Sequence, residues 1–118
     1  MLSFSSQKLD TIAEARFQQR LSDMMLESLP DSRGVIDTPE GQKTIAEQCA
    51  KARSYGMSTE LDIANYVITA WLLGLDFDTR LTAMREILAM PELTASQKAT
   101  LITQVSSVVL AELEKGKR

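Results

Sequence analysis

Apolar residues recur every three or four positions along almost the whole chain, and this spacing predicts helices. No window sustains the period-two alternation with turn residues that would indicate strands. The pattern divides into five predicted helices, over residues 6–29, 38–55, 58–74, 78–90 and 94–114. Because the predicted connectors are short, we expect an all-α fold, a compact bundle of about five helices. The length of 118 residues predicts a single helical domain over 1–118.

The predicted boundaries coincide with residues that favour helix ends. Prolines and glycines stop the helices, at Pro30, Gly56, Gly74 and Pro91. Hydroxyl or carboxyl side chains are expected to cap the starts, namely Thr38, Ser58 or Thr59, Asp78 or Thr79, and Thr94. Gln97 completes a capping box with Thr94. Residues 31–37 are predicted to form a loop with a turn at 32–34.

The third predicted helix is apolar nearly all round, so we expect it to be buried at the centre of the bundle by several neighbours. Its main apolar face is predicted to consist of Leu61, Ala64, Val67, Ile68, Trp71, Leu72 and Leu75. Other apolar side chains, including Ile63 and Tyr66, fall on its other sides. If this helix is central, Trp71→Ala should cost about 3–5 kcal/mol of stability.

Composition and charge narrow the class of protein. Hydrophobic residues make up 44% and charged residues 25%, which is ordinary for a soluble globular protein. The formal net charge of −3 argues against a nucleic-acid partner, which would require a basic face. The longest apolar stretch, residues 61–75, is shorter than the roughly 20 residues that span a bilayer. The first residues lack a signal-peptide pattern, so we expect a cytoplasmic protein without a membrane partner.

The inventory of reactive side chains argues against catalysis. The chain has no histidine, which removes the commonest general base and metal ligand. Its one cysteine, Cys49, lies at a helical apolar spacing and is expected to be a small buried hydrophobe. The pair Asp76 and Asp78 could in principle bind a divalent metal, but Arg80 stands where a further ligand is needed. We therefore expect a connector in which one Asp caps the next helix, and no enzyme activity, metal or cofactor.

The first predicted helix carries a stripe enriched in methionine, formed by Phe17, Leu21, Met24 and Met25. Flexible thioether side chains adapt to irregular partner surfaces, so this stripe is a candidate partner-binding face. The alternative is that the stripe packs into the protein's own core, and the pattern is compatible with both interpretations.

The stretch Ala52–Tyr66 contains an Arg-x-Tyr-Gly turn followed by a Ser/Thr-Glu-x-Asp helix start. An apolar helix, a Gly-x-Asp-Phe-Asp exit and a segment over residues 87–93 follow. These motifs resemble small helical proteins encoded beside type VI secretion spike and effector-chaperone genes. The resemblance covers about the second half of the chain and lies on Arg53, Tyr55, Gly56, Asp76, Phe77 and Asp78, with Trp71 in the helix between them.

The resemblance implies a non-enzymatic co-chaperone or adaptor. Such a protein would bind an effector chaperone in the cytoplasm and help to load a toxic effector onto the secretion spike. Two alternatives stay open, an immunity protein that neutralises a toxin by direct binding and a small DNA-binding regulator. Among the motif residues, we assign Tyr55, Trp71 and Phe77 to the core first and to an interface second.

Overall fold

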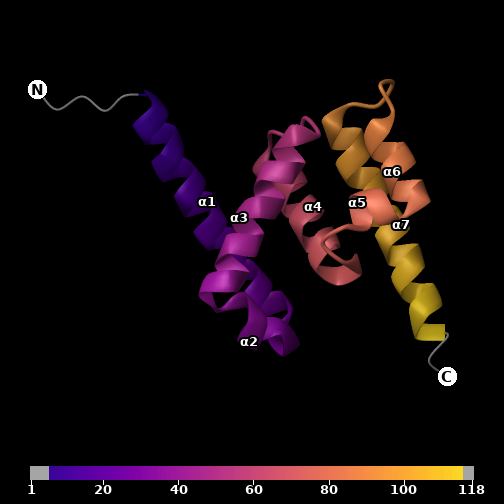
Figure 1. Cartoon of the computed structure of the whole chain (residues 1–118), viewed down its shortest axis with the longest axis horizontal. Helices are drawn as coiled ribbons and strands as arrows, with labels where there is room; N and C mark the ends of the chain where they lie inside the picture. The colour runs from indigo at the N-terminus through magenta and orange to yellow at the C-terminus, as the bar shows by residue number, and fades with distance from the viewer. Residues whose placement is uncertain (1–5, 116–118) are drawn as a thin grey trace, which may run out of the picture. The chain divides into compact units, whose positions relative to one another are not determined.

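The computed structural model describes the backbone of residues 6–115 and the side chains of residues 11–112 and 115. Helices make up most of this part of the chain, and no strand occurs in it, so the predicted all-α class is confirmed (Figure 1). The described residues form seven α-helices and one 3₁₀ helix, where five helices were predicted. They are α1 (Ser6–Ser28), η1 (Pro30–Ser32), α2 (Arg33–Ile36), α3 (Pro39–Ser54), α4 (Glu60–Leu73), α5 (Phe77–Arg80), α6 (Thr82–Ala89) and α7 (Ala95–Lys115).

Tertiary contacts group the chain into two units, Met1–Ala46 and Glu47–Arg118, with the boundary inside α3. The single domain expected from the chain length stays a prediction. No helix in the described part of the chain has the length and apolar character needed to cross a bilayer.

In the first unit, α1 packs against η1 and α2. The unit ends at Ala46, so it includes the first half of α3. Thr38 caps α3 as predicted, because its hydroxyl oxygen accepts a hydrogen bond of 2.9 Å from the Gly41 amide. The Gln42 amide donates to the Ser22 hydroxyl and to the Ile36 carbonyl, at 2.8 Å each, which ties α3 to α1 and α2. The buried apolar side chains of this unit are Phe17, Leu21, Met25, Ile36 and Ile45.

The loop predicted over residues 31–37 is instead made of two single helical turns, η1 and α2. Proline at the first position of η1 favours helical backbone angles, which explains how a turn forms directly after α1 ends. Ile36, the last residue of α2, is fully buried and anchors the segment.

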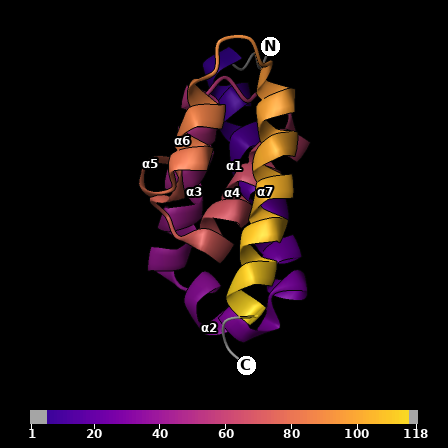
Figure 2. The ribbon, with the colours of Figure 1, turned by 90° about the vertical axis from the view of Figure 1, so that its right-hand side faces the viewer.

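In the second unit, α4 lies along α7, and α6 packs against α5 and α7 (Figures 1 and 2). The Ser96 hydroxyl donates to the Asp62 carboxylate at 2.6 Å, so the first turns of α4 and α7 lie side by side. The capping predictions for both helices are confirmed: the Asp62 amide donates to the Thr59 hydroxyl, and Thr94 and Gln97 bond each other reciprocally. The buried apolar side chains of this unit are Cys49, Ala52, Met57, Ile63, Ala64, Tyr66, Val67, Ala70, Phe77, Met84, Leu88, Ala99 and Ile102.

The fourth predicted helix is divided into α5 and α6. Leu81 has an extended conformation (ψ 113°) that interrupts the helix between them. The predicted cap is also wrong, because α5 begins at Phe77 and Asp78 lies inside it. The residue before α5 is Asp76, whose side chain makes no capping hydrogen bond.

The predicted buried face of α4 is wrong in part. Ile63 and Tyr66, which were placed on its other sides, are buried, whereas Leu61, Leu72 and Leu75 are exposed. Trp71, expected in the core, is only half-buried. On a helix that is apolar all round, the pattern does not show which side meets α7, so contacts with α7 and α5 decide which side chains are buried.

Candidate functional site

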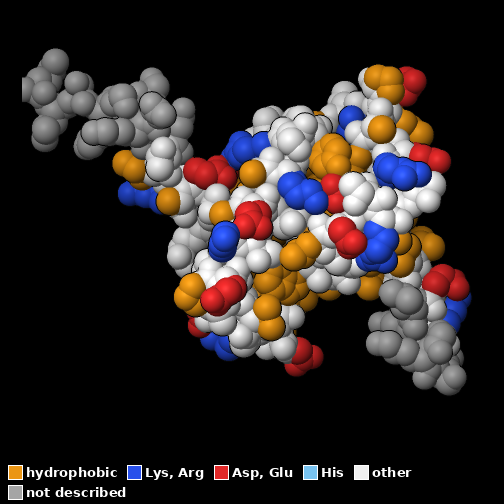
Figure 3. Space-filling view, in the orientation of Figure 1, with side chains coloured by type: hydrophobic (Ala, Val, Ile, Leu, Met, Phe, Trp, Pro, Cys, Tyr) orange, Lys and Arg blue, Asp and Glu red, His pale blue; other side chains and the backbone are white. Residues whose placement is uncertain are grey.

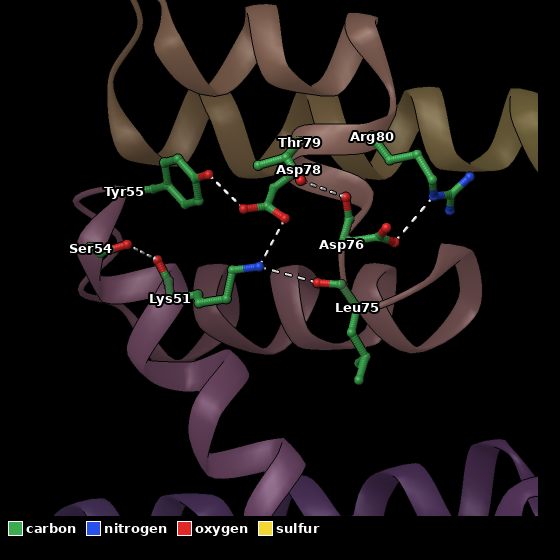
Figure 4. Close-up of polar contacts among 8 residues, drawn as sticks. All are labelled: Lys51, Ser54, Tyr55, Leu75, Asp76, Asp78, Thr79 and Arg80. Atoms are coloured by element: carbon green, nitrogen blue, oxygen red, sulfur yellow. Dashed lines mark hydrogen bonds and ion pairs between the residues drawn. The ribbon is translucent and has the colours of Figure 1, made fainter.

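Three of the motif residues singled out from the sequence, Tyr55, Asp76 and Asp78, lie where the end of α3 meets the α4–α5 connector and the first turn of α5 (Figure 4). Lys51 lies in the last turn of α3 and Tyr55 follows the helix directly, four residues later, so their side chains project from the same side. Gly56 (φ 92°) and Gly74 (φ 117°) adopt backbone angles that other residues rarely reach, and they end α3 and α4. These two glycines let the chain reverse so that the connector over residues 74–76 and the first turn of α5 meet the end of α3.

Asp78 lies at the centre of this cluster, and its side chain is only 3% exposed. The Lys51 ammonium donates to one carboxylate oxygen at 2.8 Å, and the Tyr55 hydroxyl donates to the other at 2.7 Å. Lys51 also donates to the Leu75 carbonyl at 3.1 Å. We refer to Lys51, Tyr55 and Asp78 as the Asp78 clamp, because they join two segments that are more than 20 residues apart in the sequence.

The electrostatics of the clamp favour an ionised Asp78. Burial by itself raises the pKa of this carboxyl, but the hydrogen bonds from Lys51 and Tyr55 and the charge of Lys51 outweigh burial and hold the pKa below its usual value. For Tyr55, burial, the hydrogen bond to Asp78 and the nearby carboxylate charge raise the pKa to about 12. Asp78 therefore stays charged and Tyr55 stays neutral at ordinary pH.

Two fully buried aromatic side chains, Tyr66 and Phe77, lie beside the clamp. Their ring centroids lie 5.0 Å apart, and the rings of Tyr55 and Tyr66 lie 5.8 Å apart, distances typical of stabilising aromatic pairs. The Tyr66 hydroxyl is buried and has no hydrogen-bond partner among the described residues. Burial, followed by the charge of Asp78, raises the pKa of Tyr66 strongly.

The bonds of the Asp78 clamp are suited to holding the backbone of two chain segments in place. Both oxygens of Asp78 are engaged by donors, and its lowered pKa makes it a weak base. Asp76 forms an exposed ion pair with Arg80 at 3.1 Å, and Arg80 also donates to the Leu73 carbonyl at 2.6 Å, at the end of α4. The two carboxylates that suggested a possible metal site thus face different cations. No group of three or more metal-ligating side chains occurs among the residues that the structure describes.

The structure brings together some of the residues singled out from the sequence. Tyr55, Phe77 and Asp78 belong to the cluster. Gly56 forms the turn that follows Tyr55, and Asp76 lies in the connector between α4 and α5. Arg53 is exposed on α3, and Trp71 is half-buried on α4. Sequence reasoning missed Lys51 and Tyr66. The spacing of Lys51 and Tyr55 placed them on one side of a helix, but no local signal pairs Lys51 with a residue 27 positions away.

The four side chains proposed to bind a partner on α1 are placed differently from one another. Phe17, Leu21 and Met25 are buried, whereas Met24 is 40% exposed. Other large apolar side chains that reach the surface are Ile12 and Val35 in the first unit and Leu61, Leu72, Leu75, Met90 and Val108 in the second. Figure 3 shows apolar side chains at the surface in several places on the face in view.

Comparison with protein-family models, with curated proteins and with solved structures finds no match to this chain. The inference of function therefore depends on the clamp, the exposed apolar side chains and the sequence motifs.

Proposed function

We propose that this chain is a non-enzymatic cytoplasmic adaptor that binds an effector chaperone and assists the loading of a toxic effector onto the type VI secretion spike. The partner class follows from the resemblance of the Arg53–Asp78 motifs to proteins encoded beside such genes. The observation that supports a binding role is the exposure of large apolar side chains in the first unit, with Met24 on α1 and Val35, 61% exposed, on α2.

The proposed mechanism is docking of a partner on a preformed helical surface. The helices that carry Met24 and Val35 pack against each other, and Gln42 fastens both to the start of α3. A surface on packed helices loses little conformational freedom on binding, which favours affinity. Met24 can adapt its side chain to an apolar pocket, since a thioether chain has several rotatable bonds.

Co-purification of the full chain with the effector chaperone encoded beside it tests this proposal. The wild type should form a stable complex, and Met24→Asp with Val35→Asp should weaken binding at least tenfold, because each places a charge in an apolar contact. Ala15→Asp is the matched control, since it adds the same charge to an exposed position of α1 and should bind as the wild type does.

Two outcomes contradict the proposal. If the wild type forms no complex with the chaperone, and deletion of the gene for this protein leaves effector delivery unchanged, the adaptor role is wrong. If the protein instead protects a cell that expresses the toxin alone, the immunity role replaces it.

A further inference from the structure

One face of α4 is apolar and open to solvent. It consists of Leu61, Asn65, Ile68, Leu72 and, directly after the helix, Leu75, and we refer to these five residues as the α4 seam. Leu61, Leu72 and Leu75 are 70%, 41% and 45% exposed, and Asn65 and Ile68 are half-buried. The outward face of a surface helix is normally polar or charged, so an uncharged face of this length indicates an interaction surface.

The spacing of the α4 seam is typical of a helix that pairs with another helix. Its members follow one another at intervals of four, three, four and three residues, the pattern of core positions in a coiled coil. One of the five is an asparagine, and a single polar residue among apolar core positions commonly selects the register and number of helices that pair. α4 packs against α7, and the side chains opposite the seam, among them Ile63 and Tyr66, are buried, whereas Leu61, Leu72 and Leu75 are exposed and can make a second contact.

Charged groups lie near both ends of α4. Glu60 opens the helix. At its other end the guanidinium of Arg80 donates to the Leu73 carbonyl and pairs with Asp76. A guanidinium has five N–H donors, and two of these groups make the contacts above. An antiparallel second α4 would place its Glu60 near the Asp76–Arg80 ion pair of the first copy, and it would oppose the two helix dipoles, which is favourable.

The Asp78 clamp holds the end of the seam in place before any partner binds. Lys51 bonds the Leu75 carbonyl, and Figure 4 shows the Leu75 side chain pointing away from Lys51 and Asp78. A preorganised apolar side chain costs less entropy to bury in an interface than a mobile one.

We propose that the α4 seam binds the same seam of a second copy of this chain, with the two α4 helices antiparallel. A twofold axis makes such an interface self-complementary, since each copy supplies the same apolar stripe and the same charged ends. The α4 helix of 14 residues is about 21 Å long, so the contact is short and the dimer is expected to be weak and concentration-dependent. This proposal is independent of the adaptor function, which uses Met24 and Val35 in the first unit.

Sedimentation equilibrium of the full chain from ~10 μM to ~1 mM tests the proposal, because weak dimers dissociate within this range. The wild type should convert from monomer to dimer as concentration rises, and Leu61→Glu with Leu72→Glu should stay monomeric. Val108→Glu is the matched control, since Val108 is an exposed apolar residue outside the seam on α7 and its variant should dimerise as the wild type does. Circular dichroism confirms that each variant is folded, and Leu61→Glu alone, at the most exposed position, replaces the double variant if that one unfolds.

Disulfide cross-linking reports the direction of pairing. An equimolar mixture of Leu61→Cys and Leu72→Cys chains should form mainly the mixed disulfide, because antiparallel pairing places position 61 of one copy near position 72 of the other. A predominance of the disulfide between two Leu61→Cys chains would show parallel pairing and overturn the proposed geometry. A wild type that is monomeric over the whole concentration range, or a dimer that the seam variants leave unchanged, would overturn the proposal itself.

Discussion

At the scale of single residues, Asp78 makes the interactions that hold the first turn of α5 against the end of α3. It is buried, charged and bonded at both oxygens, by Lys51 and by Tyr55. A buried ion pair contributes little net stability when it is complete, because desolvation offsets the attraction between the charges. Losing one partner is costly, since the other charge is then left buried without compensation.

Lys51→Met should therefore destabilise the protein by about 2–3 kcal/mol, somewhat less than for a fully buried pair because Lys51 is partly solvated. The free energy of unfolding from urea titration measures this loss. Adding Asp78→Asn to Lys51→Met should recover part of it, since the amide leaves no unpaired charge, and this double-mutant cycle is the control. Equal stability of Lys51→Met and the wild type would show that Asp78 does not depend on the ammonium group.

At the scale of elements, local signals account for most helix ends. Thr38, Thr59 and the Thr94–Gln97 box cap the helices that were expected, because a cap involves residues only three positions apart. The errors lie where a helix is a single turn. η1 and α2 replace a predicted loop, and Leu81 separates α5 from α6 within a continuous helical pattern. Such short turns depend on anchors such as Ile36 more than on their own helix propensity.

The entry into α3 requires a glycine at position 41. A Cβ there would overlap the carbonyl oxygens of Val35 and Ile36, which are backbone atoms that cannot move without displacing α2. Gly41→Ala should lower the free energy of unfolding by about 1–3 kcal/mol, because this overlap exceeds the gain of about 1 kcal/mol in helix propensity.

Gly34→Ala in α2 is the matched control for Gly41→Ala. No atom lies within 4 Å of the added methyl group, and Gly34 does not have a positive φ, so this variant should be neutral or slightly stabilising. Thermal unfolding of the two variants separates them. Similar stabilities would mean that α3 can begin without this close approach.

At the scale of the whole molecule, the buried tyrosines make stability depend on alkaline pH. Tyr55 has its pKa raised from 10.0 to about 12, and the pKa of Tyr66 is raised as well. The unfolded chain loses these protons first, so the stability they contribute is complete below pH 10 and is lost as the pH rises toward 12. The free energy of unfolding, measured by urea titration at increasing pH, should fall above pH 10.

Tyr66→Phe isolates this effect from the titration of lysines, which both proteins share. The Tyr66 hydroxyl has no hydrogen-bond partner among the described residues, so its removal should change neutral-pH stability little. The variant should lose less stability than the wild type above pH 10, because one buried ionisation is absent. Parallel pH profiles for the two proteins would contradict the raised pKa of Tyr66.

The sequence alone determined the all-α class and most helix boundaries, because both depend on spacing and capping among residues that are close in the chain. It also singled out Tyr55, Phe77 and Asp78, although as motif residues and not as a cluster. Only the tertiary structure decided that Asp78 pairs with Lys51, 27 residues away, and that α4 buries Tyr66 while it exposes Leu61. Those choices depend on which helices pack together, and a helix that is apolar on every side leaves them open until α7 covers one of its faces.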